Sequence, residues 1–231
     1  MGARLRAGRD IEPTARICYR PSRTNPRRGA ASPRSVGMSS FDVIAIASSA
    51  GGLRAVSLVL NALPPAFPPS IVVVQHLDPR HRSLMAHILS RRTVLPVKEA
   101  EETDKLAPGS VYIAPPNKHL LVNPDATLSL SQSELVHFVR PSADLLFESV
   151  AGSFRERAIA VVLSGTGSDG SMGVRAIKKM GGTVLAQDEA SSEFFGMPHA
   201  AIKTGCVDFV LSLAEIPGAL VTLVQTGEID E

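Results

Sequence analysis

The stretch FDVIAIASSAGGLRAVSLVLNALPP (41–65) decides the fold class of this chain. Residues 41–47 are mostly apolar, as expected for a short strand that is buried on both faces. A turn of small residues follows, and then apolar side chains recur at helical spacing until Pro64 and Pro65 end the helix. A strand, a tight turn and a helix in this order predict the first unit of an α/β fold.

The rest of the chain repeats this alternation. Residues 110–132 are the exception, because they alternate in polarity and contain two proline turns, which predicts an antiparallel excursion. Strands this apolar, alternating with helices, indicate a parallel sheet that is covered on both faces. The predicted strands cover 70–75, 94–99, 159–163, 182–186 and 206–213, and the predicted helices cover 82–92, 172–180, 197–204 and 216–225, with a further helix capped by Ser142.

The charge divides the chain into a tail and a body. Residues 1–40 hold nine arginines against two acidic residues, a net charge of +7, whereas residues 41–231 hold 15 basic and 20 acidic residues, a net charge of −5. We therefore expect an Arg- and Pro-rich disordered tail (1–40) followed by one folded domain (41–231). An acidic body argues against a nucleic-acid partner, and no apolar run approaches the ~18 residues of a membrane span.

The tail and the cysteines bear on location. The tail has no apolar segment of the kind that a secretory signal needs. A mitochondrial-type presequence stays open, and a start of translation at Met38 is a simpler explanation. Cys18 and Cys206 lie far apart and show no metal-ligand spacing, so we expect no disulfide and a cytoplasmic protein.

Ser49 is the first candidate for chemistry. It lies in the turn ASSAGG (47–52), between the first strand and its helix. Small neighbours let a substrate carbonyl approach the backbone, and a helix amino end favours developing negative charge. A serine at a helix start is also a common cap, so this segment alone leaves both interpretations open.

His76 and Asp169 end two further strands. His76 follows strand 70–75, and Asp169 lies in the glycine-rich loop after strand 159–163. Each alone is more typical of a loop histidine or a turn aspartate. Together with Ser49 they place a nucleophile, a base and an orienting carboxylate at the carboxyl edge of one sheet. The remaining histidines show no zinc-site spacing, so we expect no metal: His81, His87, His119, His137 and His199.

A rival interpretation rests on the same glycine-rich loop. Gly165, Gly167 and Gly170 match the dinucleotide fingerprint GxGxxG after a strand, and Asp188 follows about 20 residues on, as that fingerprint requires. Against it, the Asp169 carboxylate would lie near the pyrophosphate and repel it. A dinucleotide site also leaves the serine turn and His76 unexplained.

Six ordered motifs resemble the chemotaxis protein-glutamate methylesterases of the CheB type. The resemblance covers about 41–225. It implies a three-layer αβα sandwich with a mainly parallel, doubly wound sheet and one short antiparallel excursion. The motifs are IAIASSAGG (44–52), QH (75–76), EAEETDKLAPGSVYIAPPNKH (99–119), RPSADLLFESV (140–150), VVLSGTGSDGSMG (161–173) and QDEASSEFFGMPHAAI (187–202).

The resemblance implies an activity and its residues. Ser49 would be the nucleophile, His76 the base and Asp169 the carboxylate in hydrolysis of glutamyl methyl esters on chemoreceptor-like proteins, with glutamine deamidation as a second activity and no cofactor. We add the backbone N–H groups near Gly51 and Thr166 as candidates for the oxyanion hole.

Two features depart from the family pattern. Ala47 stands where the family's turn normally begins with glycine, which leaves the turn geometry open. Only about 40 residues precede the body, too few for the family's phosphorylatable receiver domain, so we expect constitutive activity or control by a separate partner. A catalytically inactive receptor-binding module is a third interpretation.

Overall fold

The computed structural model describes residues 41–76, 83–136 and 138–229. The predicted tail (1–40), including Cys18, lies outside the described residues, and so do His81 and His137. Residues 39–231 form one compact unit. No helix in its described part is both long and apolar enough to cross a bilayer.

Seven strands of the described residues form one parallel sheet in the order β3-β4-β2-β1-β7-β8-β9. The three strands at its centre, β2, β1 and β7, are buried along their whole length. The bounds are β1 (Val43–Ser48), β2 (Ser70–Gln75), β3 (Val97–Glu99), β4 (Val111–Ile113), β7 (Ala158–Val162), β8 (Thr183–Gln187) and β9 (Phe209–Leu211).

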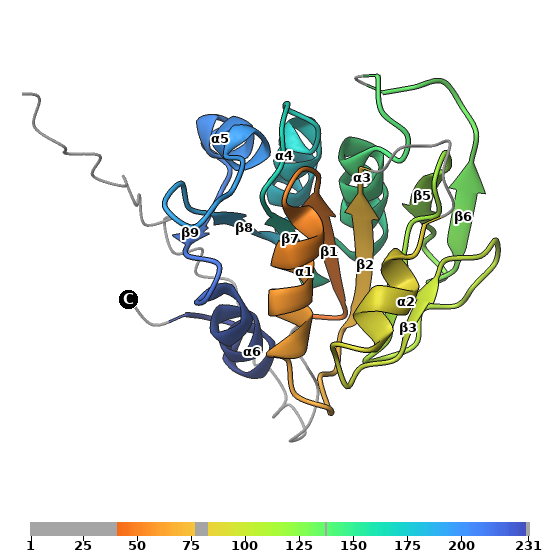
Figure 1. Ribbon diagram of the computed structural model, residues 1–231, viewed down its shortest axis with the longest axis horizontal. Coiled ribbons are helices and arrows are strands. Elements are labelled where there is room, and N and C mark those ends of the chain that lie inside the picture. The colour runs from red at the N-terminus through yellow and green to blue at the C-terminus, as the bar shows by residue number, and fades with distance from the viewer. Residues whose placement is uncertain (1–40, 77–82, 137, 230–231) are drawn as a thin grey trace, which may run out of the picture. The chain divides into compact units, whose positions relative to one another are not determined.

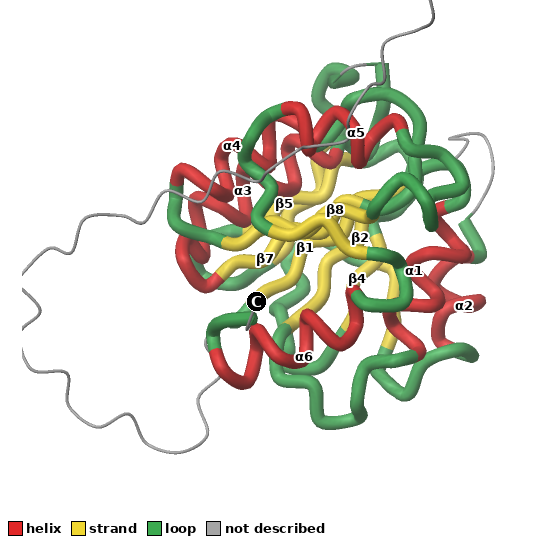
Figure 2. Tube along the Cα trace, turned by 90° about the vertical axis from the view of Figure 1, so that its left-hand side faces the viewer, coloured by secondary structure: helices red, strands yellow, loops and turns green. Residues whose placement is uncertain are grey.

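Helices cover both faces of the sheet, as Figure 2 shows from the side. The helices α1, α2 and α6 share one apolar core with the sheet, and α3, α4 and α5 share the other. The three-layer αβα sandwich is therefore confirmed. The bounds are α1 (Gly52–Asn61), α2 (Met85–Ser90), α3 (Ala143–Phe154), α4 (Ser171–Lys179), α5 (Gly196–Lys203) and α6 (Ile216–Thr226), with a 3₁₀ turn η1 (Arg155–Arg157) after α3.

The antiparallel excursion is smaller than predicted. Among the strands of the described residues, only β5 (His119–Val122) and β6 (Leu128–Ser131) pair in antiparallel fashion. β4 joins the main sheet as a parallel strand between β2 and β3. The prediction for 110–113 was therefore wrong. Val111, Tyr112 and Ile113 are all buried, as the interior of a covered parallel sheet requires, and the chain turns away only at the proline turn that follows.

The order of the strands places the candidate residues. Strand β1 is central, with β2 on one side and β7 on the other, so the chain winds outward from β1 in both directions (Figure 1). In such sheets, ligands bind outside the carboxyl ends of the strands where the winding direction changes. Ser49, His76 and the loop that holds Asp169 follow these three strands directly.

Candidate active site

The turn that carries Ser49 is fixed through its backbone. The Ser49 N–H donates to the Ser164 carbonyl (3.0 Å), and the Ser49 carbonyl accepts from the Gly52 N–H (2.9 Å). Gly51 caps α1 in the left-handed conformation, with φ of 75°, which glycine adopts without strain. These contacts leave the Ser49 side chain half-buried at the amino end of α1.

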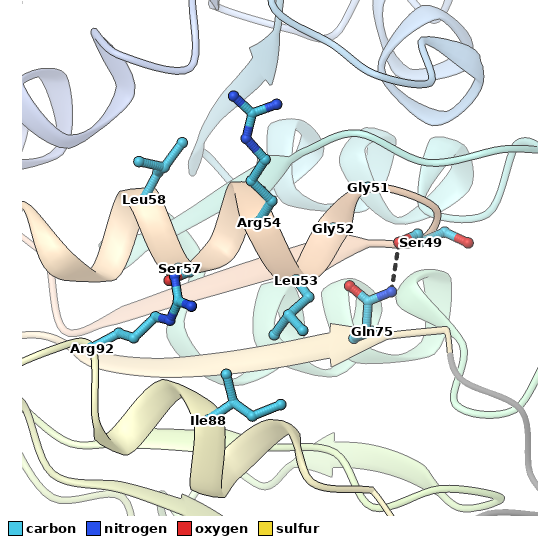
Figure 3. A pocket seen from close by; sticks show the side chains of 10 residues that line it. All are labelled: Ser49, Gly51, Gly52, Leu53, Arg54, Ser57, Leu58, Gln75, Ile88 and Arg92. Carbon is cyan, nitrogen blue, oxygen red and sulfur yellow. Dashed lines mark hydrogen bonds between the residues drawn. The ribbon is translucent and has the colours of Figure 1, made fainter.

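Gln75 is a buried clamp beneath this turn. Its amide oxygen accepts from Ser48 Oγ (2.6 Å), and its Nε2 donates to the His76 carbonyl (3.1 Å). Nε2 also donates to the Ser49 carbonyl (2.6 Å), as Figure 3 shows. Gly52 has no room for a side chain, because a Cβ atom there would overlap Gln75 Oε1. Gln75 therefore couples the turn after β1 to the turn after β2.

Ala47 stands where the family's turn normally begins with glycine. In this structure it belongs to the strand β1 and not to the turn. It is the last but one residue of β1, fully buried between Val74 and Val162 of the neighbouring strands. Positive φ angles in this segment begin only at Gly51. Alanine therefore fits at position 47 without backbone strain.

His76 lies next to Ser49 across two paired strands. Ser48 and Gln75 are partners in the β1–β2 register, and the His76 N–H donates to the Ser48 carbonyl (3.1 Å). Ser49 and His76 each follow one of these partners, so their backbones lie about one strand spacing, ~4.8 Å, apart. Within the described residues, no hydrogen bond joins the Ser49 hydroxyl to His76.

Asp169 binds the imidazole of His76. The His76 Nε2 lies 2.8 Å from Asp169 Oδ2, and the two side chains are 12% and 4% exposed. A carboxylate in this position takes the hydrogen of Nε2, so Nδ1 keeps the lone pair that can accept a proton. The structure thus brings two of the three predicted residues into direct contact and puts the third on the adjoining turn.

The amino end of α3 holds the Asp169 carboxylate. Ser142 Oγ donates to Oδ1 (2.9 Å), and the N–H groups of Ala143 and Asp144 donate to Oδ2 (2.6 Å) and Oδ1 (3.1 Å). Burial raises the pKa of Asp169, but the hydrogen bonds from His76, Ala143 and Asp144 outweigh it and bring the pKa below its ordinary value. Asp169 is therefore held as a carboxylate.

His119 helps to hold Asp169 through Ser142. It is fully buried in β5, its Nδ1 accepts from the Ser142 N–H (3.2 Å), and its Nε2 lies 3.0 Å from the Glu134 carbonyl. An N–H can only donate and a carbonyl can only accept, so the ring must be neutral with its hydrogen on Nε2. His119 thus fixes Ser142, which in turn donates to Asp169.

The amino end of α4 is already occupied by a carboxylate. Asp144 Oδ1, in the first turn of α3, accepts from the N–H groups of Met172 (2.9 Å) and Gly173 (2.7 Å). In a dinucleotide site the pyrophosphate would bind these N–H groups. Gly165 also has no free space beside it, because a Cβ atom there would overlap Met197 and approach Ser49. The arrangement argues against the dinucleotide interpretation.

The N–H groups of Gly51 and Thr166 are both available to a ligand. Neither donates to an acceptor within the described part of the chain. Ser164 Oγ links the two loops, because it donates to the Ala50 carbonyl (2.8 Å) and accepts from the Phe194 N–H (3.0 Å). The role of Gly51 and Thr166 as an oxyanion hole stays a prediction.

Sequence reasoning overlooked four of the residues that build this site: Gln75, His119, Ser142 and Ser164. Ser142 was predicted only as the cap of its helix, and it does accept from the Leu145 N–H (3.5 Å). His119 was placed correctly in the excursion but not as a buried residue. A signal did exist, because Gln75 is the last residue of the predicted strand 70–75 and Ser164 directly follows the predicted strand 159–163, where a buried polar group needs a partner.

A groove opens beside Ser49 between α1 and α2. Its volume is about 560 Å³, and it runs from Ser49 and Gln75 along the side of α1 (Figure 3). The His76–Asp169 pair is not among its lining residues. They are Ser49, Gly51, Gly52, Leu53, Arg54, Ser57, Leu58, Gln75, Ile88 and Arg92.

Comparisons with known proteins agree on one family. Residues 44–220 match the model of the CheB methylesterase family. The chain is 44% identical over 185 residues to the protein-glutamate methylesterase FrzG of Myxococcus xanthus, and this alignment covers 80% of the chain and 55% of FrzG. A protein-glutamate methylesterase/protein-glutamine glutaminase of Anaeromyxobacter dehalogenans is 43% identical over 194 residues, covering 84% of the chain and 56% of that protein.

A solved structure has the same fold. The crystal structure of the Thermotoga maritima CheB methylesterase catalytic domain superposes with a TM-score of 0.77 at 38% identity, covering 80% of this chain and 100% of that one. The chain thus spans about half the length of these two curated relatives and the whole of the catalytic domain in the crystal structure.

Proposed function

The chain belongs to the CheB methylesterase family, and we propose that it hydrolyses the methyl esters of glutamyl residues on a chemoreceptor-like protein. Ser49 is the nucleophile, His76 the general base and Asp169 the carboxylate that orients His76. The observation that carries the proposal is the 2.8 Å hydrogen bond between His76 and the buried Asp169, one strand away from the Ser49 turn.

The reaction proceeds through an acyl-enzyme. Ser49 Oγ attacks the γ-carbonyl carbon of the ester while His76 Nδ1 takes the hydroxyl proton. The tetrahedral intermediate collapses, and His76 returns the proton to the departing methanol. Water then attacks the acyl-enzyme while His76 takes a proton from it. His76 returns this proton to Ser49 Oγ as the glutamate side chain is released. Asp169 stabilises the imidazolium in both halves without taking its proton.

The negative charge of the intermediate needs hydrogen-bond donors. Gly51 lies in the Ser49 turn and Thr166 in the loop after β7, and neither N–H has an acceptor in the described part of the chain, which supports them as the oxyanion hole. The amino end of α1, which begins directly after Gly51, adds a favourable dipole. No step of this scheme requires a metal or an organic cofactor.

The same chemistry extends to a second activity. If ammonia leaves in place of methanol, the acyl-enzyme is formed from glutamine and the product is again glutamate. The name of the Anaeromyxobacter relative includes protein-glutamine glutaminase, which favours this activity here. We expect the protein to act in the cytoplasm, on the cytoplasmic part of a methylated receptor, and under the control of a separate regulatory partner.

Labelling with a serine-directed fluorophosphonate tests the proposal. The protein should react at Ser49, identified by mass spectrometry of the labelled peptide, and Ser49→Ala should abolish labelling. Methanol release from a glutamyl methyl ester peptide should fall at least about 10³-fold in the same variant. The neighbouring Ser48→Ala is not a neutral control, because Ser48 donates to Gln75. Ser133→Ala serves instead, because Ser133 is exposed and does not line the groove.

The outcomes separate the competing interpretations. An inactive receptor-binding module would bind the methylated peptide without labelling or methanol release. A dinucleotide protein would do neither and would bind NAD, which equilibrium dialysis detects. Labelling at a serine other than Ser49, or methanol release that survives Ser49→Ala, would refute the assignment of the nucleophile.

A further inference from the structure

Ser164 lies between three loops at the carboxyl edge of the sheet and is only 1% exposed. Its N–H donates to the side-chain oxygen of Gln187 (2.9 Å), and its carbonyl accepts from the Ser49 N–H (3.0 Å). Its hydroxyl donates to the Ala50 carbonyl (2.8 Å) and accepts from the Phe194 N–H (3.0 Å). Each polar group of Ser164 thus has a partner, and these partners hold the buried hydroxyl in one position.

The hydrogen bond to Ala50 orients the Gly51 N–H. The Ala50 carbonyl and the Gly51 N–H belong to one peptide unit, which is trans. The C=O and N–H of a trans peptide unit lie in one plane and point in opposite directions. The Gly51 N–H therefore points away from the buried Ser164 hydroxyl. A carbonyl that accepts a hydrogen bond also makes the N–H of its own peptide unit a stronger donor.

The Thr166 N–H is oriented in the same way. It shares a peptide unit with the Gly165 carbonyl, which accepts from the N–H of the buried Met197 (2.8 Å). The Thr166 N–H therefore points away from Met197. Gly165 also packs against the nucleophile, because a Cβ atom at Gly165 would lie 2.9 Å from Ser49 Cβ. The second candidate donor of the oxyanion hole is thus fixed in direction close to Ser49.

The Ser164 hydroxyl links these two peptide units. It bonds directly to the first unit through the Ala50 carbonyl. It reaches the second through Phe194, whose N–H donates to Ser164 Oγ and whose carbonyl accepts from the Gly165 N–H (2.9 Å). Loss of this hydroxyl would release the Ala50 carbonyl and the Phe194 N–H together. The Gly51 and Thr166 N–H groups would then no longer be held relative to one another.

We propose that Ser164 is a positioning residue, whose hydroxyl sets the directions of the Gly51 and Thr166 N–H groups and thereby the fit of the oxyanion hole to the tetrahedral intermediate. The inference rests on the proposed esterase function. Oxyanion-hole donors act on the charge that develops in the transition state more than on the neutral carbonyl of the bound ester. Ser164 therefore contributes to kcat and hardly to KM.

Steady-state hydrolysis of a glutamyl methyl ester peptide tests this role. Ser164→Ala should lower kcat about 10–100-fold and leave KM within about twofold of the wild-type value, because misplaced donors weaken binding of the transition state alone. Ser164→Thr keeps a hydroxyl and should restore part of kcat. Ser70→Ala is the matched control and should keep the wild-type kcat. Ser70 is also buried and donates to a carbonyl, that of Ala107 (2.8 Å), but it begins β2 at the opposite edge of the sheet.

A tetrahedral analogue separates the oxyanion hole from the rest of the site. The probe is a peptide with a trifluoromethyl ketone in place of the ester. Ser49 Oγ adds to its carbonyl carbon while His76 takes the hydroxyl proton, and the carbonyl oxygen becomes an oxyanion. The Ki of this ketone should rise in Ser164→Ala by about the factor by which kcat falls. A peptide with norleucine at the ester position forms no oxyanion and should bind wild type and variant with equal Kd.

Circular dichroism melting establishes that each variant is folded at the assay temperature. If Ser164→Ala is not, Ser164→Cys replaces it, because a thiol fills the same place but donates only weakly, and the ketone Ki should again rise.

Wild-type kcat in the folded variant would overturn the inference, and so would a fall in kcat with an unchanged ketone Ki, or an equal fall in Ser70→Ala. Each of these results leaves fluorophosphonate labelling of wild-type Ser49 intact, so the role of Ser164 fails while the proposed function stands. A wild type that is neither labelled nor inhibited by the ketone would instead remove the esterase, and the oxyanion hole with it.

Discussion

Asp169 is 4% exposed and accepts hydrogen bonds from four groups, whereas Ser49, which follows the neighbouring strand at the same sheet edge, is half-buried at the mouth of an open groove. On the α3 side of the site, the hydrogen bonds that hold Asp169 are thus already formed without a substrate. On the α1–α2 side, the groove beside Ser49 is still open. In the proposed function the two sides have different tasks. Acid–base chemistry needs a base in fixed orientation, and a protein substrate needs an accessible surface.

The largest loss of turnover should come from a substitution on the α3 side. Asp169→Asn replaces the acceptor of the His76 Nε2 hydrogen with an amide, which favours the wrong imidazole tautomer, and should lower kcat for methanol release by about 10⁴-fold. Steady-state kinetics with a methylated peptide measures this. Asp208→Asn, which removes an exposed ion pair with Lys178, should keep the wild-type rate. If Asp169→Asn retained wild-type turnover, Asp169 would serve the fold and not the chemistry.

The Ser49 turn, which lies between the two sides, should show the next largest effect when a side chain is added to it. Gly52→Ala places a methyl group against Gln75 and Ser48, which are both buried and bonded to one another, and should lower the free energy of unfolding by about 1–3 kcal/mol. The shift of the urea midpoint measures it. Gly218→Ala in α6 meets no atom within 4 Å, so it should be neutral or stabilising. Equal midpoints for the two variants would show that the turn tolerates a side chain.

His119 distinguishes orientation from folding on the α3 side. His119→Leu removes the acceptor of the Ser142 N–H and should lower kcat by about 10–100-fold, because small misplacements of catalytic groups have effects of this size. KM should hardly change, since His119 does not line the groove. His119→Asn offers an amide oxygen near the position of Nδ1 and should restore part of kcat. If both variants lost melting temperature alike but kept kcat, His119 would be only a core residue.

The fold and the positions of Ser49, His76 and Asp169 could be predicted because each depends on a short stretch of sequence. An apolar strand followed at once by Ser49, His76 or the Asp169 loop places these residues at one edge of a parallel sheet, whatever the distant contacts are. The strand Val111–Ile113 was missed because three residues cannot reveal a period, and the proline turns next to it dominate the pattern.

The support of Asp169 could not be predicted in this way. It depends on the amino end of α3 meeting the loop before α4, and on His119 from a hairpin reaching Ser142. These contacts join segments 23 to 27 residues apart, and neither segment signals the other in its own sequence. The groove is likewise a product of packing, because Leu53 and Ile88 meet only when α1 and α2 lie side by side.

The smallest effect, and the one that isolates the electrostatics of the α3 side, is the pH dependence of stability. The pKa of Asp169 is lowered in the folded protein, so the folded state binds fewer protons at this site than the unfolded chain, whose aspartates have a pKa of about 3.9. The stabilisation by the carboxylate is therefore complete above pH ~4 and is lost as the pH falls through the lowered pKa.

Urea denaturation of the wild type and of Asp169→Asn measures this loss. The difference between their free energies of unfolding should be constant from pH 7 to about 5 and should become smaller below about pH 4. Asp125 is exposed, and hydrogen bonds from Thr127 lower its pKa. The free-energy difference between the wild type and Asp125→Asn should therefore also shrink on acidification, but by less, because solvent screens this carboxylate. If the difference in free energy of unfolding instead grew on acidification, the folded protein would hold Asp169 in its protonated form. The α3 side of the site would then lack the negative charge that orients His76.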